Sequence, residues 1–282
     1  MSKSSVKINC ELPLGLLPIN IWLNDYDFVL FHLYINSDEY KEYYKTIRKT
    51  NPQRTMILDN SAYEFYVKGE TLDVDKYVQT INELKPDYYI LPDVLMDQQL
   101  TLSGVEDFIE NHSINCDAKP LAVVQGSTEE EMLECMNVYK QTGLNDICIP
   151  FHNSFYKDMS LDPELVSTFG KAYKLNPVNS LTEDMKYAAG RVQFIMNNYV
   201  KLEDFNYIHL LGSHCPFEKF FYRDSVISSM DTGYPVKLAM KRIRLGKEKE
   251  KPDIIIDDFF EKKMQLVDHM FIDANIRIFK NY

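Results

Sequence analysis

Hydrophobic positions along the chain form short continuous runs that alternate with longer stretches of helical period. Short runs rich in β-branched and aromatic residues are typical of strands buried on both faces. The runs that predict strands are 28–35, 55–58, 88–91, 121–124, 147–150, 207–211 and 226–230. The stretches that predict helices are 74–84, 100–111, 129–142 and 182–198, and residues 127–130 form a typical helix cap.

The spacing of these elements predicts the fold class. Successive predicted strands begin roughly 25 to 35 residues apart over most of the chain, which is the repeat of a βα unit in a parallel sheet. At 282 residues, a (β/α)8 barrel and an open doubly wound sheet both fit. The gap from 151 to 206 is wider than the others, and we expect an insertion or a further strand in it.

Polar or small residues follow six of the predicted strands. They are Asp59-Asn60-Ser61, Pro92-Asp93, Gln125-Gly126, Phe151-His152-Asn153, Gly212-Ser213-His214 and Asp231-Thr232-Gly233. A doubly wound sheet concentrates its site at one switch point, whereas a barrel gathers the carboxyl ends of nearly all its strands around one pocket. The even distribution favours an α/β (β/α)8 TIM barrel, and the chain contains neither glycine-rich phosphate loop, GxGxxG or GxxxxGK[ST].

Composition narrows the class of protein. Hydrophobic residues make up 45% of the chain, enough for a sizeable core, and the absence of a Gly/Ser tract predicts one domain over residues 1–282. We expect a cytoplasmic protein that does not bind membranes, because we find neither a signal peptide nor an apolar stretch of membrane-spanning length. The five cysteines form no CxxC pair, which predicts buried, reduced thiols without a zinc site.

Basic residues concentrate in one segment of an acidic chain. The net charge is −11, yet residues 237–251 hold seven basic residues against two acids. The basic residues are Lys237, Lys241, Arg242, Arg244, Lys247, Lys249 and Lys251. A solvated surface loop would explain such a run. Because the run begins six residues after Asp231, at a predicted strand end, we favour a role in binding the phosphates of a nucleic acid.

Three strand-end acids, Asp59, Asp93 and Asp231, are the candidates for chemistry. One such acid often caps the next helix, but three at one rim point to a reaction. In retaining glycosyl transfer, one carboxylate attacks C1′ and a second group moves a proton to the departing group. A glycosidase or a free-nucleoside deoxyribosyl transferase would use the same pair.

Other strand-end residues suit a planar, amide-like ligand edge. Gln125 can donate and accept hydrogen bonds, and the backbone near Gly212 can do likewise because no side chain blocks approach. Purine bases have such edges. Tyr63 can stack on a planar ligand, although in a chain with 19 tyrosines a core or surface role is also open.

Five motifs, taken in order, resemble those of the tRNA-guanine transglycosylase superfamily. They are Asp59-Asn60-Ser61-Ala62-Tyr63-Glu64, Leu91-Pro92-Asp93, Val124-Gln125-Gly126, His209-Leu210-Leu211-Gly212 and Ser229-Met230-Asp231. The chain looks most like the compact DpdA branch, which exchanges guanine in DNA for 7-deazaguanine bases. The resemblance covers about two thirds of the chain, from Thr55 to Lys237.

This resemblance implies a (β/α)8 barrel and a set of residue roles. Asp231 would be the nucleophile at C1′ and Asp59 the general acid/base. The expected base-binding residues are Asp93, Gln125, Gly212, Tyr63, Phe151 and His152. The expected partners are DNA and a 7-deazaguanine base such as preQ0, no cofactor is needed, and the setting implied is phage DNA modification against restriction.

The chain also departs from the family pattern. The tRNA enzymes usually carry a zinc subdomain with three cysteines and a histidine, which is missing here. Ser61-Ala62 replaces the common Gly-Gly pair, Glu64 the usual Gln, and Phe151-His152-Asn153 a glycine-rich turn. His152 and His214 suit a phosphate or sugar contact at the same rim, or a structural role. A tRNA-guanine transglycosylase, or a non-catalytic nucleic-acid-binding partner subunit of one, is the alternative function.

Overall fold

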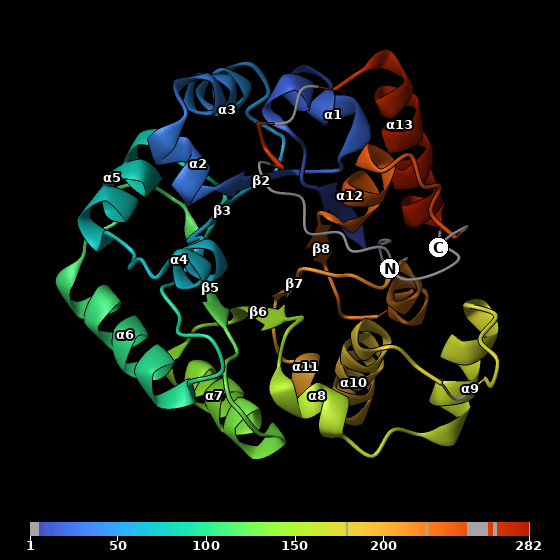
Figure 1. The fold of residues 1–282 in the computed structure, drawn as a ribbon. Helices are drawn as coiled ribbons and strands as arrows, with labels where there is room; N and C mark the ends of the chain where they lie inside the picture. Colours follow the sequence, from blue (N-terminus) through green and yellow to red (C-terminus); the bar gives the residue numbers. More distant parts are fainter. Residues whose placement is uncertain (1–5, 179, 224, 247–258, 262–263, 282) are drawn as a thin grey trace. The chain divides into compact units, whose positions relative to one another are not determined.

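Strands and helices alternate in a computed structural model, which describes residues 6–178, 180–223, 225–246, 259–261 and 264–281 (Figure 1). The strands among these residues are β1 Lys7–Cys10, β2 Asp27–Leu30, β3 Met56–Asp59, β4 Tyr88–Ile90, β5 Lys119–Val123, β6 Asp146–Pro150, β7 Tyr207–Leu211 and β8 Ser229–Thr232. Most of their residues are buried, as the apolar runs predict.

Helices connect these strands and follow the last one. In chain order they are η1 Leu14–Ile19, α1 Asn20–Leu23, α2 Phe31–Asn36, α3 Asp38–Thr50, α4 Ala62–Lys68, α5 Val74–Leu84, α6 Gln98–Asn111, α7 Glu129–Thr142, α8 Ser154–Asp158, α9 Pro163–Ala172, α10 Glu183–Asn197, α11 Tyr199–Leu202, η2 Pro216–Tyr222, α12 Tyr234–Met240 and α13 Leu266–Asn281. The elements η1 and η2 are 3₁₀ helices. The predicted helices 74–84 and 129–142 coincide with α5 and α7.

The order of the strands identifies a (β/α)8 barrel of the TIM-barrel class. Hydrogen bonds join them in the order β1-β8-β7-β6-β5-β4-β3-β2, so the strands from β2 to β8 are neighbours in chain order and β1 lies beside β8. The β1–β8 pair and the pairs from β2 to β6 run parallel. A doubly wound sheet reverses its strand order at a switch point, and this sheet does not. The predicted fold class is therefore confirmed.

The strand that the sequence pattern missed lies near the amino terminus. In β1, Lys7 and Asn9 interrupt the apolar positions, so the strand has no continuous run, although Asn9 is buried. The wide gap between β6 and β7 was expected to hold an insertion or a further strand. Its described residues contain the helices α8 to α11 and no strand, so the insertion is the correct alternative.

Two predicted strands differ by more than two residues at one end from the strands in the structure. The run 28–35 is a strand only as far as Leu30, and α2 begins at Phe31. Neither Gly nor Pro separates the two elements, so the apolar pattern continues through their junction. The run 226–230 shifts to Ser229–Thr232, which places Asp231 within β8 rather than directly after it.

The chain divides into two compact units. The middle unit comprises Tyr26–Pro150 and Asp204–His209, and the terminal unit comprises Met1–Asp25, Phe151–Glu203 and Leu210–Tyr282. In the middle unit, α5, α6 and α7 lie on one side of β3, β4 and β5, the strands that precede them (Figure 1). Tyr77 of α5 joins this core to α2, because its ring centroid lies 5.0 Å from that of Phe31.

Helix pairs organise the terminal unit. Helix α8 packs on α10, and α12 packs on α13 (Figure 1). At the first of these contacts, the ring centroids of Tyr156 and Phe194 are 6.0 Å apart, and both residues are fully buried. Gly190 of α10 faces the backbone of Tyr156 so closely that an added Cβ would lie 2.2 Å from its carbonyl oxygen. The two helices can approach this closely only because residue 190 has no side chain.

All five cysteines are free thiols, and four of them are buried. Cys116 is the one that is partly exposed. In the parts of the chain that the structure describes, no helix is both long enough and apolar enough to cross a membrane.

The close approach of α8 and α10 makes Gly190 a position that tolerates no side chain. We expect Gly190→Ala to lower the free energy of unfolding by about 2 kcal/mol, because the methyl group must displace backbone atoms. The matched control is Gly104→Ala in α6, where an added Cβ meets nothing within 4 Å. That change should stabilise the protein by about 0.5 kcal/mol through helix propensity. Urea unfolding measures both variants, and equal stability would contradict the packing described.

Candidate functional site

The predicted base-binding residues Asp93 and Gln125 lie together in the middle unit. They follow the neighbouring parallel strands β4 and β5, and Nε2 of Gln125 donates to Oδ2 of Asp93 at 2.7 Å. The other oxygen of Asp93 accepts from Nδ2 of Asn60, which follows β3, at 2.8 Å. The same Nδ2 donates to the carbonyl oxygen of Leu91 at 2.7 Å. Three neighbouring strand ends therefore form one hydrogen-bonded cluster.

Burial and hydrogen bonding set the properties of this cluster. Desolvation raises the pKa of the Asp93 carboxyl above its ordinary value, while the amide groups of Asn60 and Gln125 act in the opposite direction. Gln125 is 3% exposed, and its Oε1 accepts from the N–H of Met96 at 2.9 Å. The orientation of the Gln125 carboxamide is thereby fixed. A carboxylate beside a fixed carboxamide is complementary to the N–H and carbonyl groups on the edge of guanine.

Asp59, the predicted general acid/base, is the last residue of β3 and is half-buried. Its Oδ2 accepts from the N–H of Ser61 at 2.8 Å. Ser61 has a left-handed backbone with a φ of 59°, which is uncommon for a residue with a side chain. The turn leads directly into α4, and Oδ1 of Asn60 supports it by accepting from the N–H of Ala62 at 2.8 Å. The turn thus fixes the position of Asp59.

His32 lies beside this turn. Together with Ser61 and Glu64 it has the residue types of a hydrolytic triad, but not the geometry of one. Its Nδ1 lies 2.9 Å from Oγ of Ser61 and 4.0 Å from Oε2 of Glu64. In a triad, the hydroxyl and the carboxylate bind opposite nitrogens of the imidazole, whereas here both lie on Nδ1. Ser61 Oγ also accepts from the backbone N–H of His32 at 3.1 Å, so these contacts hold the loops together.

Asp231, the predicted nucleophile, lies in the terminal unit and is 4% exposed. Its Oδ1 accepts from the N–H of Gly212, directly after β7, at 2.9 Å. Gly212 has a φ of 66°, a conformation that favours glycine. Its carbonyl oxygen accepts from Nη2 of Arg191 at 2.7 Å. A base that contacts the Gly212 backbone, as the sequence predicted, would share groups that already bind Asp231 and Arg191.

The predicted contacts Phe151 and His152 follow β6 and differ in exposure. Phe151 is 3% exposed, and the Arg191 guanidinium carbon lies 4.9 Å from its ring centroid, so it packs inside the terminal unit. His152 is exposed, and its ring centroid lies 5.1 Å from that of His214 and 5.3 Å from that of Tyr187. These three rings form a cluster suited to stacking or hydrogen bonding with a ligand.

Tyr63, the remaining predicted base contact, lies on α4 in the middle unit. It comes four residues after Asp59, and it is 55% exposed. An exposed ring so near to the strand-end acid suits stacking better than a core role.

The basic segment is only partly available for phosphates in the described residues. Lys241, Arg242 and Arg244 are exposed. Arg242 also binds α13 and the residue before it, with Nε 3.0 Å from Oδ1 of Asp268 and Nη2 2.7 Å from Oε1 of Gln265. Lys237 Nζ lies 5.7 Å from the ring centroid of Phe259. The remaining basic residues, Lys247, Lys249 and Lys251, lie outside the described residues.

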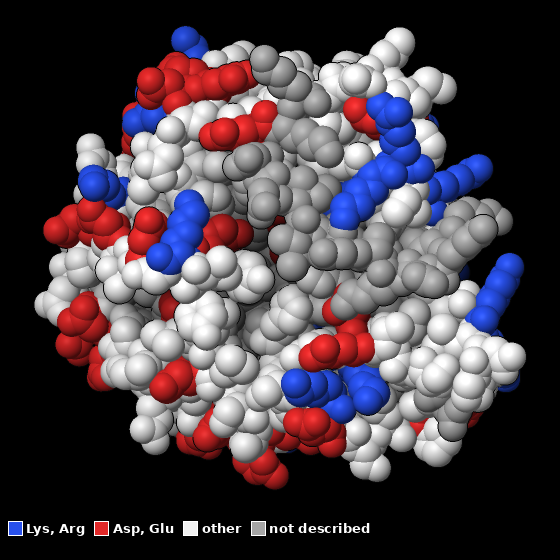
Figure 2. All heavy atoms as spheres, in the orientation of Figure 1, with Lys and Arg blue, Asp and Glu red and all other residues white. Residues whose placement is uncertain are grey.

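Lys and Arg side chains on the face shown in Figure 2 occur at separate places, with Asp and Glu among them. Among the described residues of the basic segment, the exposed Lys241 and Arg244 are candidates for single phosphate contacts.

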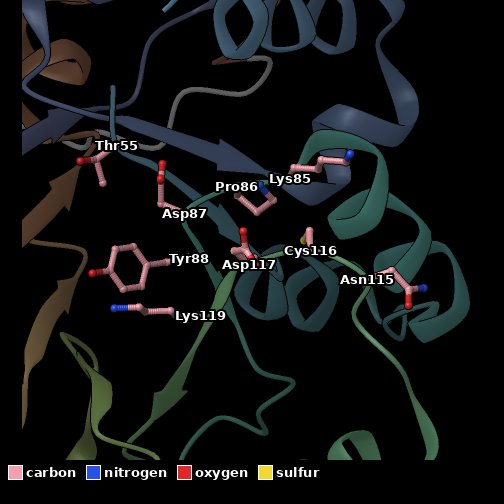
Figure 3. Close-up of a pocket in the computed structure, with 10 residues that line it drawn as sticks. Thr55, Lys85, Pro86, Asp87, Tyr88, Asn115, Cys116, Asp117 and Lys119 are labelled. Carbon is pink, nitrogen blue, oxygen red and sulfur yellow. The ribbon is translucent and has the colours of Figure 1, made fainter. Parts of the chain in front are cut away.

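A hollow of about 630 Å³ opens at the amino ends of β3, β4 and β5 (Figure 3). Thr55, Lys85, Pro86, Asp87, Tyr88, Asn115, Cys116, Asp117, Ala118 and Lys119 line it. Asp59, Asp93 and Gln125 stand at the opposite, carboxyl ends of the same strands. In (β/α)8 enzymes the carboxyl ends carry the chemistry, so this hollow is separate from the candidate site.

Asn60, His32 and Arg191 contact these clusters and were not among the predicted site residues. Asn60 was visible in the motif after β3, but its bond to Asp93 depends on the pairing of two strands. Arg191 lies in the predicted helix 182–198. His32 lies in the run 28–35, which predicted a strand but forms α2 from Phe31 onward. No local sequence pattern marks either residue as part of a site. Among the described residues there is no group of three or more His, Cys, Asp or Glu side chains placed to hold a metal ion.

No family model matches the chain, and no curated protein matches it. The resemblance to the guanine transglycosylases therefore rests on the five motifs and their order in the sequence.

The environment of His32 predicts a pH dependence of stability. Burial, with a smaller contribution from Lys68, lowers the pKa of His32 to about 4. In the unfolded chain the pKa of histidine is about 6.5, so the folded state disfavours the proton and stability falls as the pH drops from about 6.5 to 4. We expect a loss of at most about 3 kcal/mol over this range, measured by urea unfolding. His32→Gln should reduce that loss, and an unchanged pH dependence would contradict the assignment.

Proposed function

We propose that the protein is a base-exchanging transglycosylase that replaces guanine in DNA by a 7-deazaguanine base. The observation that carries the proposal is the setting of Asp231, a nearly buried carboxylate on the last strand of a (β/α)8 barrel. A backbone N–H fixes one of its oxygens, and a nucleophilic carboxylate needs such a fixed orientation. The cluster of Asn60, Asp93 and Gln125 supports the choice of a guanine-like base.

The proposed reaction is a double displacement at C1′. Guanine leaves its stack, and an oxygen of Asp231 forms an ester bond to C1′ while the C1′–N9 bond breaks and its electron pair leaves with guanine. Asp59 supplies a proton to the departing base, directly or through water. The incoming 7-deazaguanine then gives its N9 proton to Asp59, attacks C1′ and releases the Asp231 carboxylate. Positive charge develops on the sugar in both steps, and ionised Asp231 stabilises it.

Base recognition is assigned to the cluster in the middle unit. The Asp93 carboxylate would accept hydrogen bonds from N–H groups of the guanine edge, and the Gln125 amide would donate to its carbonyl oxygen. The N–H groups and the carbonyl oxygen that these side chains would bind are also present on the edge of 7-deazaguanine bases. The same contacts can therefore serve the departing and the incoming base.

DNA is preferred to tRNA as the polymer because the five motifs look more like those of the compact DNA branch than like those of the tRNA enzymes. Exposed Lys241 and Arg244 follow the strand that carries Asp231, so they are the residues assigned to the flanking phosphates. Phage DNA modification that protects against restriction is the proposed setting.

The proposal predicts which carboxylates are essential for base exchange. Labelled guanine and 7-cyano-7-deazaguanine, offered with DNA or with tRNA, should be incorporated into DNA only. Asp231→Asn should reduce incorporation by a factor of about 10³ or more, because no covalent intermediate forms. Asp59→Asn should reduce it by about 10², the typical loss of a general acid.

Asp273→Asn is the matched control, because Asp273 is a surface carboxylate of α13 paired with Arg277. It should leave incorporation unchanged. Incorporation into tRNA alone would show that the protein is a tRNA-guanine transglycosylase instead. Activity that survives in Asp231→Asn, or no incorporation into either polymer by the folded protein, would contradict the proposal.

A second prediction separates a polymer substrate from a free nucleoside. The double variant Lys241→Gln/Arg244→Gln should bind a DNA oligonucleotide more weakly. The slope of log affinity against log salt should fall by about 2, one for each phosphate that the variant no longer neutralises. Fluorescence anisotropy at several salt concentrations measures both quantities. Arg277→Gln, another exposed charge in the terminal unit, is the control, and equal slopes in all three proteins would contradict the phosphate role.

A further inference from the structure

The terminal unit contains a completely buried ion pair between Arg191 of α10 and Glu218 of η2. Both side chains are 0% exposed. Nη2 of Arg191 donates to Oε1 of Glu218 at 2.6 Å, and Nε donates to Oε2 at 3.2 Å. The hydroxyl of Tyr222 donates to the same carboxylate at 3.2 Å. A buried pair is costly to desolvate and is therefore weak evidence for a purely stabilising role.

The remaining donors of Arg191 reach the end of β7. Nη1 donates to the carbonyl oxygen of Leu211 at 3.0 Å, and Nη2 donates to that of Gly212 at 2.7 Å. The planar guanidinium can bind a carboxylate on one edge and two carbonyls on another at fixed angles, which a lysine ammonium cannot do. The contact with the Phe151 ring restrains the guanidinium further.

One peptide unit connects this arginine to the candidate nucleophile. The C=O of Leu211 and the N–H of Gly212 belong to the same rigid peptide plane. The C=O accepts from Arg191, and the N–H donates to Oδ1 of Asp231 at 2.9 Å. A cationic donor on the carbonyl polarises the amide and strengthens the bond that its N–H makes.

We propose that Arg191, held by Glu218, is a positioning residue that orients the Asp231 carboxylate through the Leu211–Gly212 peptide. Arg191 fixes the peptide plane, and the peptide plane fixes one oxygen of Asp231. The effect on catalysis rests on the proposed function, whereas the link from Arg191 to the Gly212 amide can be tested without any activity.

Nuclear magnetic resonance of the Gly212 amide tests the link directly. Labelling glycine nitrogen together with the leucine carbonyl carbon selects the three glycines that follow leucine, which are Gly15, Gly212 and Gly246. The Gly212 signal is the one that moves in Asp231→Asn, because this change weakens its acceptor. Hydrogen exchange of the same amide reports how firmly the bond is held.

Arg191→Lys keeps the positive charge but removes the planar set of N–H donors that binds Glu218, Leu211 and Gly212. We expect the Gly212 signal to move and its amide to exchange about tenfold faster or more, while the Gly15 signal stays in place. Phe194→Leu is the matched control, since Phe194 is a buried residue of the same helix that contacts α8. Its Gly212 signal should coincide with that of the wild-type protein.

A second variant tests the same link in case Arg191→Lys does not fold. In Arg191→Met/Glu218→Leu, both charges are replaced by apolar side chains, a change that buried ion pairs often tolerate without loss of stability. The Gly212 signal should again move and its exchange accelerate. A folded variant of either kind in which the Gly212 shift and exchange match the wild type would overturn the proposal.

Base-exchange kinetics then test the consequence. In both Arg191 variants kcat should fall about tenfold or more, with KM for the incoming base within about twofold, because Asp93 and Gln125 are untouched. An altered Gly212 signal with unchanged kcat would overturn the positioning role. If the wild-type protein exchanges no base, the proposed function fails, while the Gly212 measurements still decide whether Arg191 orients Asp231.

Discussion

The carboxyl end of a buried parallel strand leaves backbone groups that lack a partner in the sheet, and they must be satisfied where little water reaches them. Side chains from adjoining segments meet this requirement throughout the protein. The hydroxyl of Tyr77 lies 2.7 Å from the carbonyl oxygen of Ile90, and that of Tyr139 lies 2.8 Å from the carbonyl oxygen of Val123. Arg191 serves the end of β7 in the same way. This constraint determines which polar groups stand at the strand ends.

Groups that satisfy the backbone are also groups whose positions are fixed. Asn60 binds the carbonyl of Leu91 and, with the same nitrogen, Asp93. Gly212 directly follows β7, and its N–H donates to Asp231. The carboxylates of the candidate site are therefore held by parts of the chain that the sheet needs in any case. Such supporting contacts supply the preorganisation that catalysis requires.

The sequence predicts seven of the eight strands found in the described residues, because buried parallel strands leave uninterrupted apolar runs. It fails at β1, where the polar Lys7 and Asn9 break the run, and at the start of α2, where no breaking residue marks the change of element. The strand-end positions of Asp59, Asp93 and Gln125 could be predicted because each residue follows or ends an apolar run. The roles of Asn60, His32 and Arg191 were not, because each depends on a partner on another strand or helix.

The pairing of the first strand with the last sets the order of events during synthesis. Lys7 pairs with Ser229, and Asn9 pairs with Asp231, so most of the chain lies between the partners. Closing so long a loop is slow, and strand pairs near in sequence form first. As the chain leaves the ribosome, β1 must wait for β8, and among the described strands the one that bears Asp231 is the last to be made. A nascent chain therefore has the residues of the Asn60, Asp93 and Gln125 cluster long before it has the carboxylate proposed to attack C1′.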